Sequence, residues 1–145
     1  MKHISAAALL AGLLLAACGG SAPAAPAAAL PMLELSVEAR DFSYEPAMLE
    51  LLAGQPVGLT LVNLGALEHD LSVMEIALQA PAVEHSPDGH SMEMSETPEL
   101  HVSAQAGETG LVEFTPTQAG AYEFYCTVAG HKEAGMVGTL IVRQP

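Results

Sequence analysis

Residues 122–140 read YEFYCTVAGHKEAGMVGTL and place three different metal-binding side chains at regular intervals. Four residues separate Cys126 from His131, and four more separate His131 from Met136. On either side lie runs that alternate apolar and polar side chains. Thiolate and thioether sulfur stabilise Cu(I), whereas imidazole also suits Cu(II), so this set of donors fits copper. Alternation along the flanking runs predicts that the donor loop connects two β-strands.

A second imidazole would complete a copper site, and His69 supplies one just after an Asn-Leu-Gly turn signal at residues 63–65. Two His and one Cys in a plane with a long, weak Met bond form the blue-copper electron-transfer arrangement. Each residue alone has an ordinary explanation. Cys126 could be a small buried hydrophobe, Met136 a core side chain, His131 an exposed loop residue and His69 a partner of nearby acids. The combination of all four at this spacing favours copper.

On these residues the chain resembles the cupredoxins, the small type 1 copper proteins that include plastocyanins, azurins and auracyanins. The resemblance covers roughly residues 33–142, and the spacing of the donor loop is most similar to that of auracyanin. It implies a Greek-key β-sandwich or barrel that holds one type 1 copper per chain. The ligands implied are His69, Cys126, His131 and Met136. It also implies that Asp70 hydrogen-bonds the Cys126–Thr127 backbone.

The rest of the chain carries strand-period runs separated by Gly and Pro, with no convincing helix. We expect strands at residues 33–39, 48–53, 57–63, 69–76, 100–102, 109–114, 121–126 and 137–142, with a bend at 42–46. Such spacing predicts a single all-β sandwich domain. On the strand before the donor loop, Tyr122, Phe124 and Cys126 should face inward, and Glu123 and Tyr125 outward.

The N-terminal residues are typical of an export signal. Lys2 precedes an apolar run at residues 4–17 that is shorter than the about 20 residues needed to span a bilayer. Residues 15–18 resemble a bacterial lipobox, in which Cys18 would be lipidated; the alternative is an ordinary signal cleaved after Ala17. We expect a signal peptide at 1–17, an Ala/Pro-rich tether at 18–31 and the copper domain at 32–145. The protein would then be anchored to a membrane on its extracytoplasmic side, either periplasmic or at the cell surface.

The cysteine count is compatible with this interpretation. A disulfide is the ordinary expectation for two cysteines in an exported protein. Cys18, however, lies in the lipobox and before any packed segment, which leaves Cys126 unpaired and free for a metal.

Charge excludes one class of partner. Removing residues 1–17 takes away Lys2 and no acid, so three Lys and Arg side chains face 17 carboxylates and the formal net charge becomes −14. This balance argues against nucleic acid and favours a basic protein partner.

Residues 79–98 interrupt the strand pattern and predict a long loop. The loop contains a cluster of imidazole and thioether side chains that could hold a second, labile Cu(I): His85, His90, Met92 and Met94. The alternative is a solvated acidic loop whose methionines cover an edge of the core.

The leading functional hypothesis is a monomeric carrier of single electrons between redox proteins, such as cytochromes or respiratory or photosynthetic complexes. Electrons would pass through the edge of His131, within a patch of small and apolar residues that includes 65–67 and Ala134. Copper trafficking or storage is the alternative. A multicopper oxidase or nitrite reductase is disfavoured, because Tyr125 and Thr127, not His, flank Cys126 and the chain has no His-x-His pair.

Overall fold

The computed structural model describes residues 30–85 and 97–145, which form ten β-strands and, within these ranges, no helix. The strands follow the chain as β1 (Leu33–Arg40), β2 (Ser43–Glu45), β3 (Met48–Leu52), β4 (Val57–Asn63), β5 (His69–Val73), β6 (Val83–His85), β7 (Leu100–Ala104), β8 (Thr109–Phe114), β9 (Gly120–Tyr125) and β10 (Val137–Arg143). The predicted signal peptide, Cys18 and nearly all of the predicted tether lie outside the described residues.

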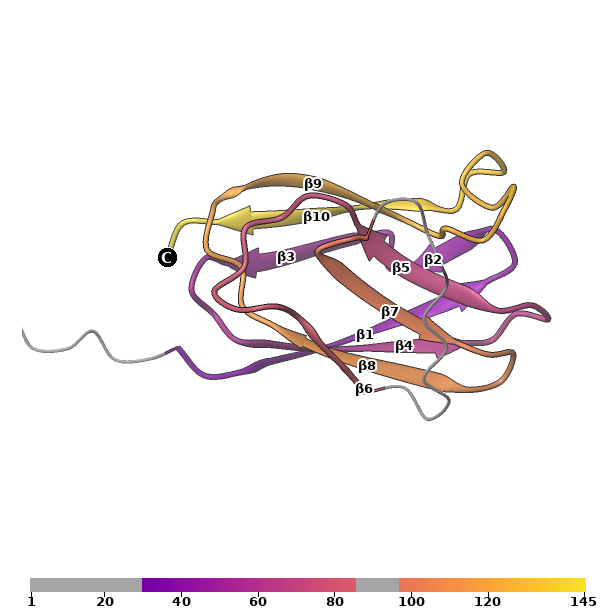
Figure 1. The fold of residues 1–145 in the computed structure, drawn as a ribbon, viewed down its shortest axis with the longest axis horizontal. Coiled ribbons are helices and arrows are strands. Elements are labelled where there is room, and N and C mark those ends of the chain that lie inside the picture. Colours follow the sequence, from indigo (N-terminus) through magenta and orange to yellow (C-terminus); the bar gives the residue numbers. More distant parts are fainter. Residues whose placement is uncertain (1–29, 86–96) are drawn as a thin grey trace, which may run out of the picture.

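The strands form two five-stranded sheets that pack face to face (Figure 1). The first sheet has the order β2-β1-β4-β8-β6, and the second has the order β3-β10-β9-β5-β7. β1 runs parallel to β4, and β3 runs parallel to β10, whereas the other neighbours are antiparallel. The prediction of a single all-β sandwich domain is therefore confirmed.

The core lies between the sheets and follows the predicted alternation. Val57, Leu59 and Leu61 of β4 are fully buried, and Phe124 of β9 and Leu140 of β10 are buried in the opposite sheet. Burying each such side chain contributes about 1.5–3 kcal/mol to the free energy of unfolding. The two inner faces thus hold the sheets together without a helix.

Three details of the predicted strands were wrong. Residues 43–45, expected as a bend, form β2, whose Tyr44 is buried against Phe124 in the other sheet. Residues 83–85, expected as loop, form β6 on the edge of the first sheet, with all three residues exposed. β5 ends at Val73 instead of Ile76, because its partner β7 begins opposite Val73. These short pairings depend on the partner strand and leave little pattern in the sequence.

Three connections meet at one end of the sandwich, on the right in Figure 1: the β1–β2 turn, the β4–β5 connection and the β9–β10 loop. The described chain begins at the opposite end, where Leu33 of β1 pairs with Val57 of β4. Residues 30–85 and 97–145 contain no helix that is long and apolar enough to cross a membrane.

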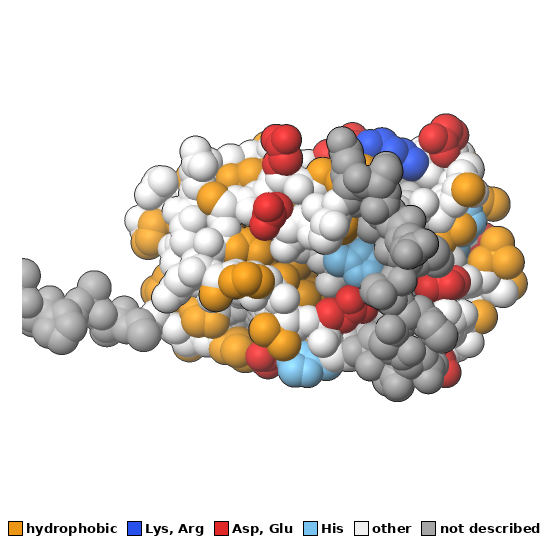
Figure 2. All heavy atoms as spheres, in the orientation of Figure 1, with side chains coloured by type: hydrophobic (Ala, Val, Ile, Leu, Met, Phe, Trp, Pro, Cys, Tyr) orange, Lys and Arg blue, Asp and Glu red, His pale blue; other side chains and the backbone are white. Residues whose placement is uncertain are grey.

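Acidic and large hydrophobic side chains are both exposed on the surface. Acidic groups are dispersed over the face drawn in Figure 2, and hydrophobic side chains lie both over the left half of this face and at its right-hand end, near the three connections. The large hydrophobic residues exposed on these connections and at the start of β10 are Phe42, Leu64, Leu67 and Val137.

Candidate metal centre

Three side chains from distant parts of the chain converge beneath the three connections. His69 begins β5, Cys126 directly follows β9, and His131 lies in the β9–β10 loop. The Cys126 sulfur lies 4.0 Å from His69 Nδ1 and 3.4 Å from His131 Nδ1. Across the part of the chain that the structure describes, this is the only group of three His, Cys, Asp or Glu side chains placed to hold a metal ion.

The connection before β5 sets the position of His69. The Asn63 side chain is fully buried. Its Nδ2 donates to Leu67 O at 2.7 Å and to Ala104 O at 2.9 Å, and its Oδ1 accepts the Gly65 N–H at 2.9 Å. One amide thereby shapes the connection and joins it to β7. His69 then enters β5 opposite Ala104 with its ring fully buried.

Backbone hydrogen bonds fold the β9–β10 loop back on itself. Met136 N–H donates to His131 O at 3.0 Å, and Cys126 N–H donates to Met136 O at 3.2 Å. Gly130 and Gly135 take φ values of 84° and 103°, in the left-handed region that side chains other than glycine avoid. The loop therefore brings Met136 back beside Cys126 and His131, with its side chain fully buried.

Asp70 links β5 to the residue after Cys126. Both of its carboxylate oxygens accept the Thr127 N–H at 3.0 Å, and Oδ2 also accepts the Thr127 hydroxyl at 2.7 Å. Oδ1 accepts the Ser72 hydroxyl at 2.9 Å. The contact with the Cys126–Thr127 backbone that the family resemblance implied is therefore present. It fixes Cys126 relative to His69.

The environment of Cys126 favours a neutral thiol unless a cation is bound. Burial, followed by the negative charge of Asp70, raises the pKa of Cys126 to about 11. The sulfur lies 3.8 Å from Asp70 Oδ2, to which its S–H can donate. A metal ion replaces such a proton and stabilises the thiolate directly.

The donor set fits copper. One cysteine sulfur and two imidazole nitrogens lie within 4.8 Å of one another in a buried site, and soft sulfur together with imidazole suits both oxidation states of copper. The structure brings together His69, Cys126 and His131, as the sequence led us to expect. Their roles as ligands, and that of Met136 as the fourth, stay predictions.

The remaining predicted site residues lie elsewhere. His85 is exposed on β6, with Nε2 at 3.9 Å from a Glu113 carboxylate oxygen. His90, Met92 and Met94 lie outside the described residues. The second copper site proposed for this loop therefore stays a prediction.

Two residues of the β1–β2 turn contact the cluster and were missed from the sequence. Asp41 Oδ1 lies 3.5 Å from His69 Nε2, and the Phe42 ring lies edge-on to His131 with 5.2 Å between ring centroids. His131 is only 4% exposed, so little of the imidazole edge through which we expect electrons to pass is open to solvent. No local pattern could reveal these contacts, because they join segments that are far apart in the chain.

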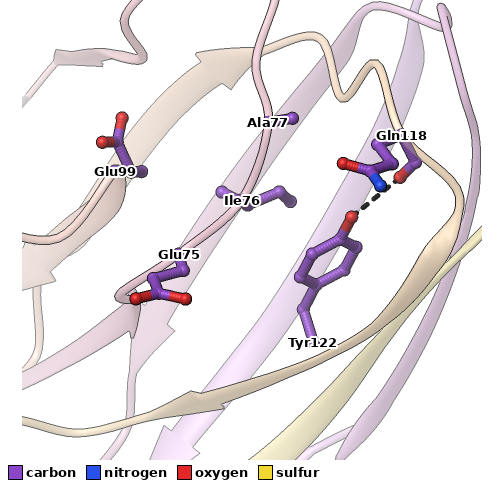
Figure 3. Close-up of a pocket in the computed structure, with 6 residues that line it drawn as sticks. All are labelled: Glu75, Ile76, Ala77, Glu99, Gln118 and Tyr122. Atoms are coloured by element: carbon purple, nitrogen blue, oxygen red, sulfur yellow. Dashed lines mark hydrogen bonds between the residues drawn. The ribbon is translucent and has the colours of Figure 1, made fainter.

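A surface hollow away from the metal cluster lies near the β5, β7 and β9 strands and is drawn in Figure 3. It is lined by the exposed Glu75 and Glu99, and by Tyr122, whose hydroxyl donates to Gln118 O at 2.9 Å. Exposed carboxylates of this kind are ordinary surface groups. The hollow does not compete with the buried cluster as a functional site.

Comparison with known proteins agrees with this geometry. The family model for copper binding proteins, plastocyanin/azurin family, matches residues 31–143. The copper-resistant cuproprotein CopI of Rubrivivax gelatinosus is 32% identical over an alignment of 106 positions, which covers 69% of this chain and 59% of that protein. The chain thus spans less than two thirds of that relative. CopI of Pseudomonas aeruginosa is 27% identical over an alignment of 162 positions, gaps included, which covers 86% of this chain and 90% of the relative.

Among solved structures, auracyanin A, a "blue" copper protein from Chloroflexus aurantiacus, superimposes with a TM-score of 0.59. The match covers 77% of this chain and 99% of auracyanin A at 21% identity. This likeness concerns the fold.

Proposed function

Because the chain belongs to the plastocyanin/azurin family of copper-binding proteins, we propose that it carries single electrons between redox partners through one type 1 copper. The observation that carries this proposal is the buried cluster of His69, Cys126 and His131. One cysteine and two histidines, with a buried methionine nearby, form the donor set of an electron-transfer site.

The chain's own residues would keep this site rigid and dry. His69 begins β5, and Cys126 directly follows β9, the strand beside β5. The Asp70 carboxylate of β5 accepts the Thr127 N–H and so joins β5 to the segment that carries Cys126. A bound copper ion would supply the one-electron redox chemistry. Because a strand and a hydrogen-bonded loop hold the donors, their arrangement should change little between redox states, which favours rapid electron transfer.

The visible spectrum of the copper-loaded protein tests the proposal. A site of two His, one Cys and one Met should be intensely blue when oxidised and should bleach reversibly on addition of one electron per copper. Cys126→Ser should abolish the band while far-ultraviolet circular dichroism retains its β signal. His85→Gln removes an imidazole outside the cluster and serves as the matched control. A blue band that survives Cys126→Ser would contradict the copper assignment.

We propose that redox partners dock at the end of the molecule that holds the metal cluster. Phe42, Leu64, Leu67 and Val137 are exposed by 46%, 48%, 52% and 37% around the three connections. A small apolar contact suits a transient complex that must dissociate quickly. The strongly negative chain would attract a basic redox partner, such as a cationic cytochrome, and the apolar residues would then form the contact.

We further propose that Cys18 carries a lipid that anchors the protein on the extracytoplasmic side of a membrane. The lipobox-like residues 15–18 support the anchor. The described chain begins at the end opposite the metal centre, so a tether there would leave the docking end free. Mass spectrometry of the mature N-terminus tests this directly. An unmodified N-terminus would exclude the anchor.

Copper trafficking or storage is the second candidate. It is favoured by the two relatives that are named copper-resistant cuproproteins. Copper titration under reducing conditions separates the candidates. A trafficking protein that uses His85, His90, Met92 and Met94 should bind more than one equivalent, and replacing all four should restore one equivalent without changing the blue band. A stoichiometry of one in the parent protein would contradict a copper-binding loop.

A further inference from the structure

The β1–β2 turn supplies none of the predicted ligands but lies against both imidazoles of the cluster. Its two residues, Asp41 and Phe42, contact His69 and His131 respectively. The two contacts differ in chemistry, since one is polar and the other is aromatic. They come from consecutive residues, so one short turn reaches both histidines.

The Asp41 carboxylate lies close to a buried His69 nitrogen that has no hydrogen-bond partner. His69 Nε2 is buried and makes no hydrogen bond, and Asp41 Oδ1 lies 3.5 Å from it. Oδ1 also accepts the Ala66 N–H at 3.0 Å, which holds the carboxylate against the β4–β5 connection. A carboxylate can only accept, so its charge favours the tautomer with the proton on the facing Nε2, which leaves Nδ1 bare towards Cys126.

Gly65 closes the space around this contact. A Cβ atom at position 65 would lie 2.6 Å from Asp41 Oδ1 and 2.6 Å from His69 Nε2. The backbone therefore packs directly against the carboxylate and the imidazole. Only a residue without a side chain permits this approach.

Phe42 adopts a backbone conformation that bulky residues avoid. Its φ is 66°, and no other described non-glycine residue has a positive φ. Such strain persists only where the surroundings over-determine it. Here the ring meets His131 edge-on at an interplanar angle of 80°. His131 is 4% exposed, although residues 129, 130 and 132–135 around it are exposed.

We propose that Asp41 and Phe42 are positioning residues that arrange the two imidazoles before a metal binds. Asp41 holds His69 in the tautomer whose Nδ1 faces Cys126, and Phe42 restricts the motion of His131 and solvent access to it. The proposal rests on the copper site proposed above. Its primary tests use metal-free protein. The positioning roles can therefore fail while copper binding succeeds, and copper binding can fail while the positioning roles hold.

The tautomer of His69 tests Asp41. In nitrogen-15 NMR spectra of the metal-free protein, His69 should carry its proton on Nε2. Asp41→Ala should lower the ratio of this tautomer to the Nδ1–H form by roughly 2- to 10-fold, since the attraction between the Nε2 proton and a half-exposed carboxylate is lost. Asp41→Asn should retain the tautomer, because the Ala66 N–H orients the amide oxygen in the same way. Glu45→Gln, a carboxylate change on β2, is the control. An unchanged ratio in Asp41→Ala would overturn the role of Asp41.

The reactivity of His131 tests Phe42. Diethyl pyrocarbonate should modify His131 roughly 2- to 10-fold faster in metal-free Phe42→Ala and Phe42→Gly, as expected for the loss of one aromatic contact. Both variants remove the ring, but only glycine also relieves the backbone strain, so comparing them distinguishes the two effects. The glycine variant also keeps the test valid if alanine disturbs folding. Leu64→Ala, another exposed apolar side chain at this end, is the control. A chelator should remove copper faster from both Phe42 variants. Unchanged His131 modification in both would overturn the role of Phe42.

Discussion

At the scale of single residues, Cys126 shows how the fold couples a thiol to its metal. Burial and Asp70 together raise the pKa of Cys126 to about 11, so a bare thiolate is unfavourable in the metal-free protein. The same carboxylate binds the Thr127 N–H and hydroxyl. It therefore holds the cysteine in place while its negative charge favours a cation at the sulfur.

Met136 provides a prediction at this scale. Met136→Leu should keep the copper but raise its reduction potential, because loss of the predicted thioether ligand and a drier site would disfavour Cu(II). The substitution nearly conserves volume, so it should lower the free energy of unfolding by less than about 1.5 kcal/mol. Redox titration and thermal unfolding measure the two effects. Met48→Leu, at an exposed position on β3, is the control, and an unchanged potential in Met136→Leu would remove Met136 from the ligand set.

At the scale of elements, one carboxylate connects the edge strand β6 to the opposite sheet. Glu84 Oε2 lies 3.0 Å from His101 Nδ1 on β7, and Oε1 accepts the Ser103 N–H at 3.0 Å and the Ser103 hydroxyl at 3.1 Å. β6 itself buries none of its three residues. Its attachment to the second sheet therefore depends on this polar contact.

The Glu84–His101 pair predicts a pH-dependent stability. Burial opposes the charged form of both groups, but their mutual hydrogen bond and charge outweigh it, so the pKa of His101 is raised above 6.5 and the pKa of Glu84 is lowered below 4.5. The raised histidine pKa gives stability that is complete below pH 6.5 and is lost as the pH rises through the folded-state value. The lowered glutamate pKa gives stability that is present above pH 4.5 and is lost as the pH falls through the folded-state value.

The pair should therefore stabilise the fold most between pH 4.5 and 6.5. In that window, Glu84→Gln should lower the free energy of unfolding of the metal-free protein by roughly 1–3 kcal/mol, and by less at higher pH. Denaturant titrations across the pH range measure this. Glu113→Gln, whose exposed partner His85 lies 3.9 Å away, should change stability little. A loss for Glu84→Gln that is the same at every pH would contradict a charged pair.

A close approach between the sheets gives another prediction at the scale of elements. A Cβ atom added to Gly110 of β8 would overlap the backbone oxygen of Ser103 on β7. Because a backbone atom cannot move aside as a side chain can, Gly110→Ala should cost about 1–3 kcal/mol. Thr109→Ala, at an exposed site on the same strand, is the control in denaturant titration. Equal stability of Gly110→Ala and the parent would mean that the two strands can separate without cost.

At the scale of the whole molecule, the sandwich separates the metal centre and the proposed docking surface from the end at which the described chain begins. The metal centre and the apolar residues lie at one end, and the N-terminal segment joins β1 at the other. The formal charge of −13 belongs to the entire chain, and it acts at long range, whereas the apolar contact acts only after encounter. Association and electron transfer should therefore respond to different changes.

Added salt should slow association with a cationic cytochrome, because charges are screened over a Debye length of about 8 Å at physiological ionic strength. Ala66→Asp and Ala134→Asp should slow electron transfer even at high salt, since each places a solvated charge in the contact surface. Stopped-flow kinetics measure both effects. Ala121→Asp, at the start of β9 and the opposite end, is the control. Unchanged high-salt rates in both variants would exclude electron exit near His131.

The sequence by itself determined the β-class of the fold, most strand positions and the loop that carries Cys126, His131 and Met136. These features are local, because alternation and residue spacing act within one short segment. The sequence also singled out His69, but only because a copper site needs a second imidazole and because the chain resembles the cupredoxins. Only the tertiary structure decided that β5 and β9 lie side by side and bring His69 to Cys126.

The tertiary structure alone also decided which residues surround the imidazoles. Phe42 covers His131, and Asp41 reaches His69, although nothing in their neighbourhood in the sequence indicates a contact. The strands β2 and β6 likewise exist because a partner edge was available for them. Contacts of this kind depend on strand order and register across the whole chain, whereas a sequence pattern reports only on the segment that carries it.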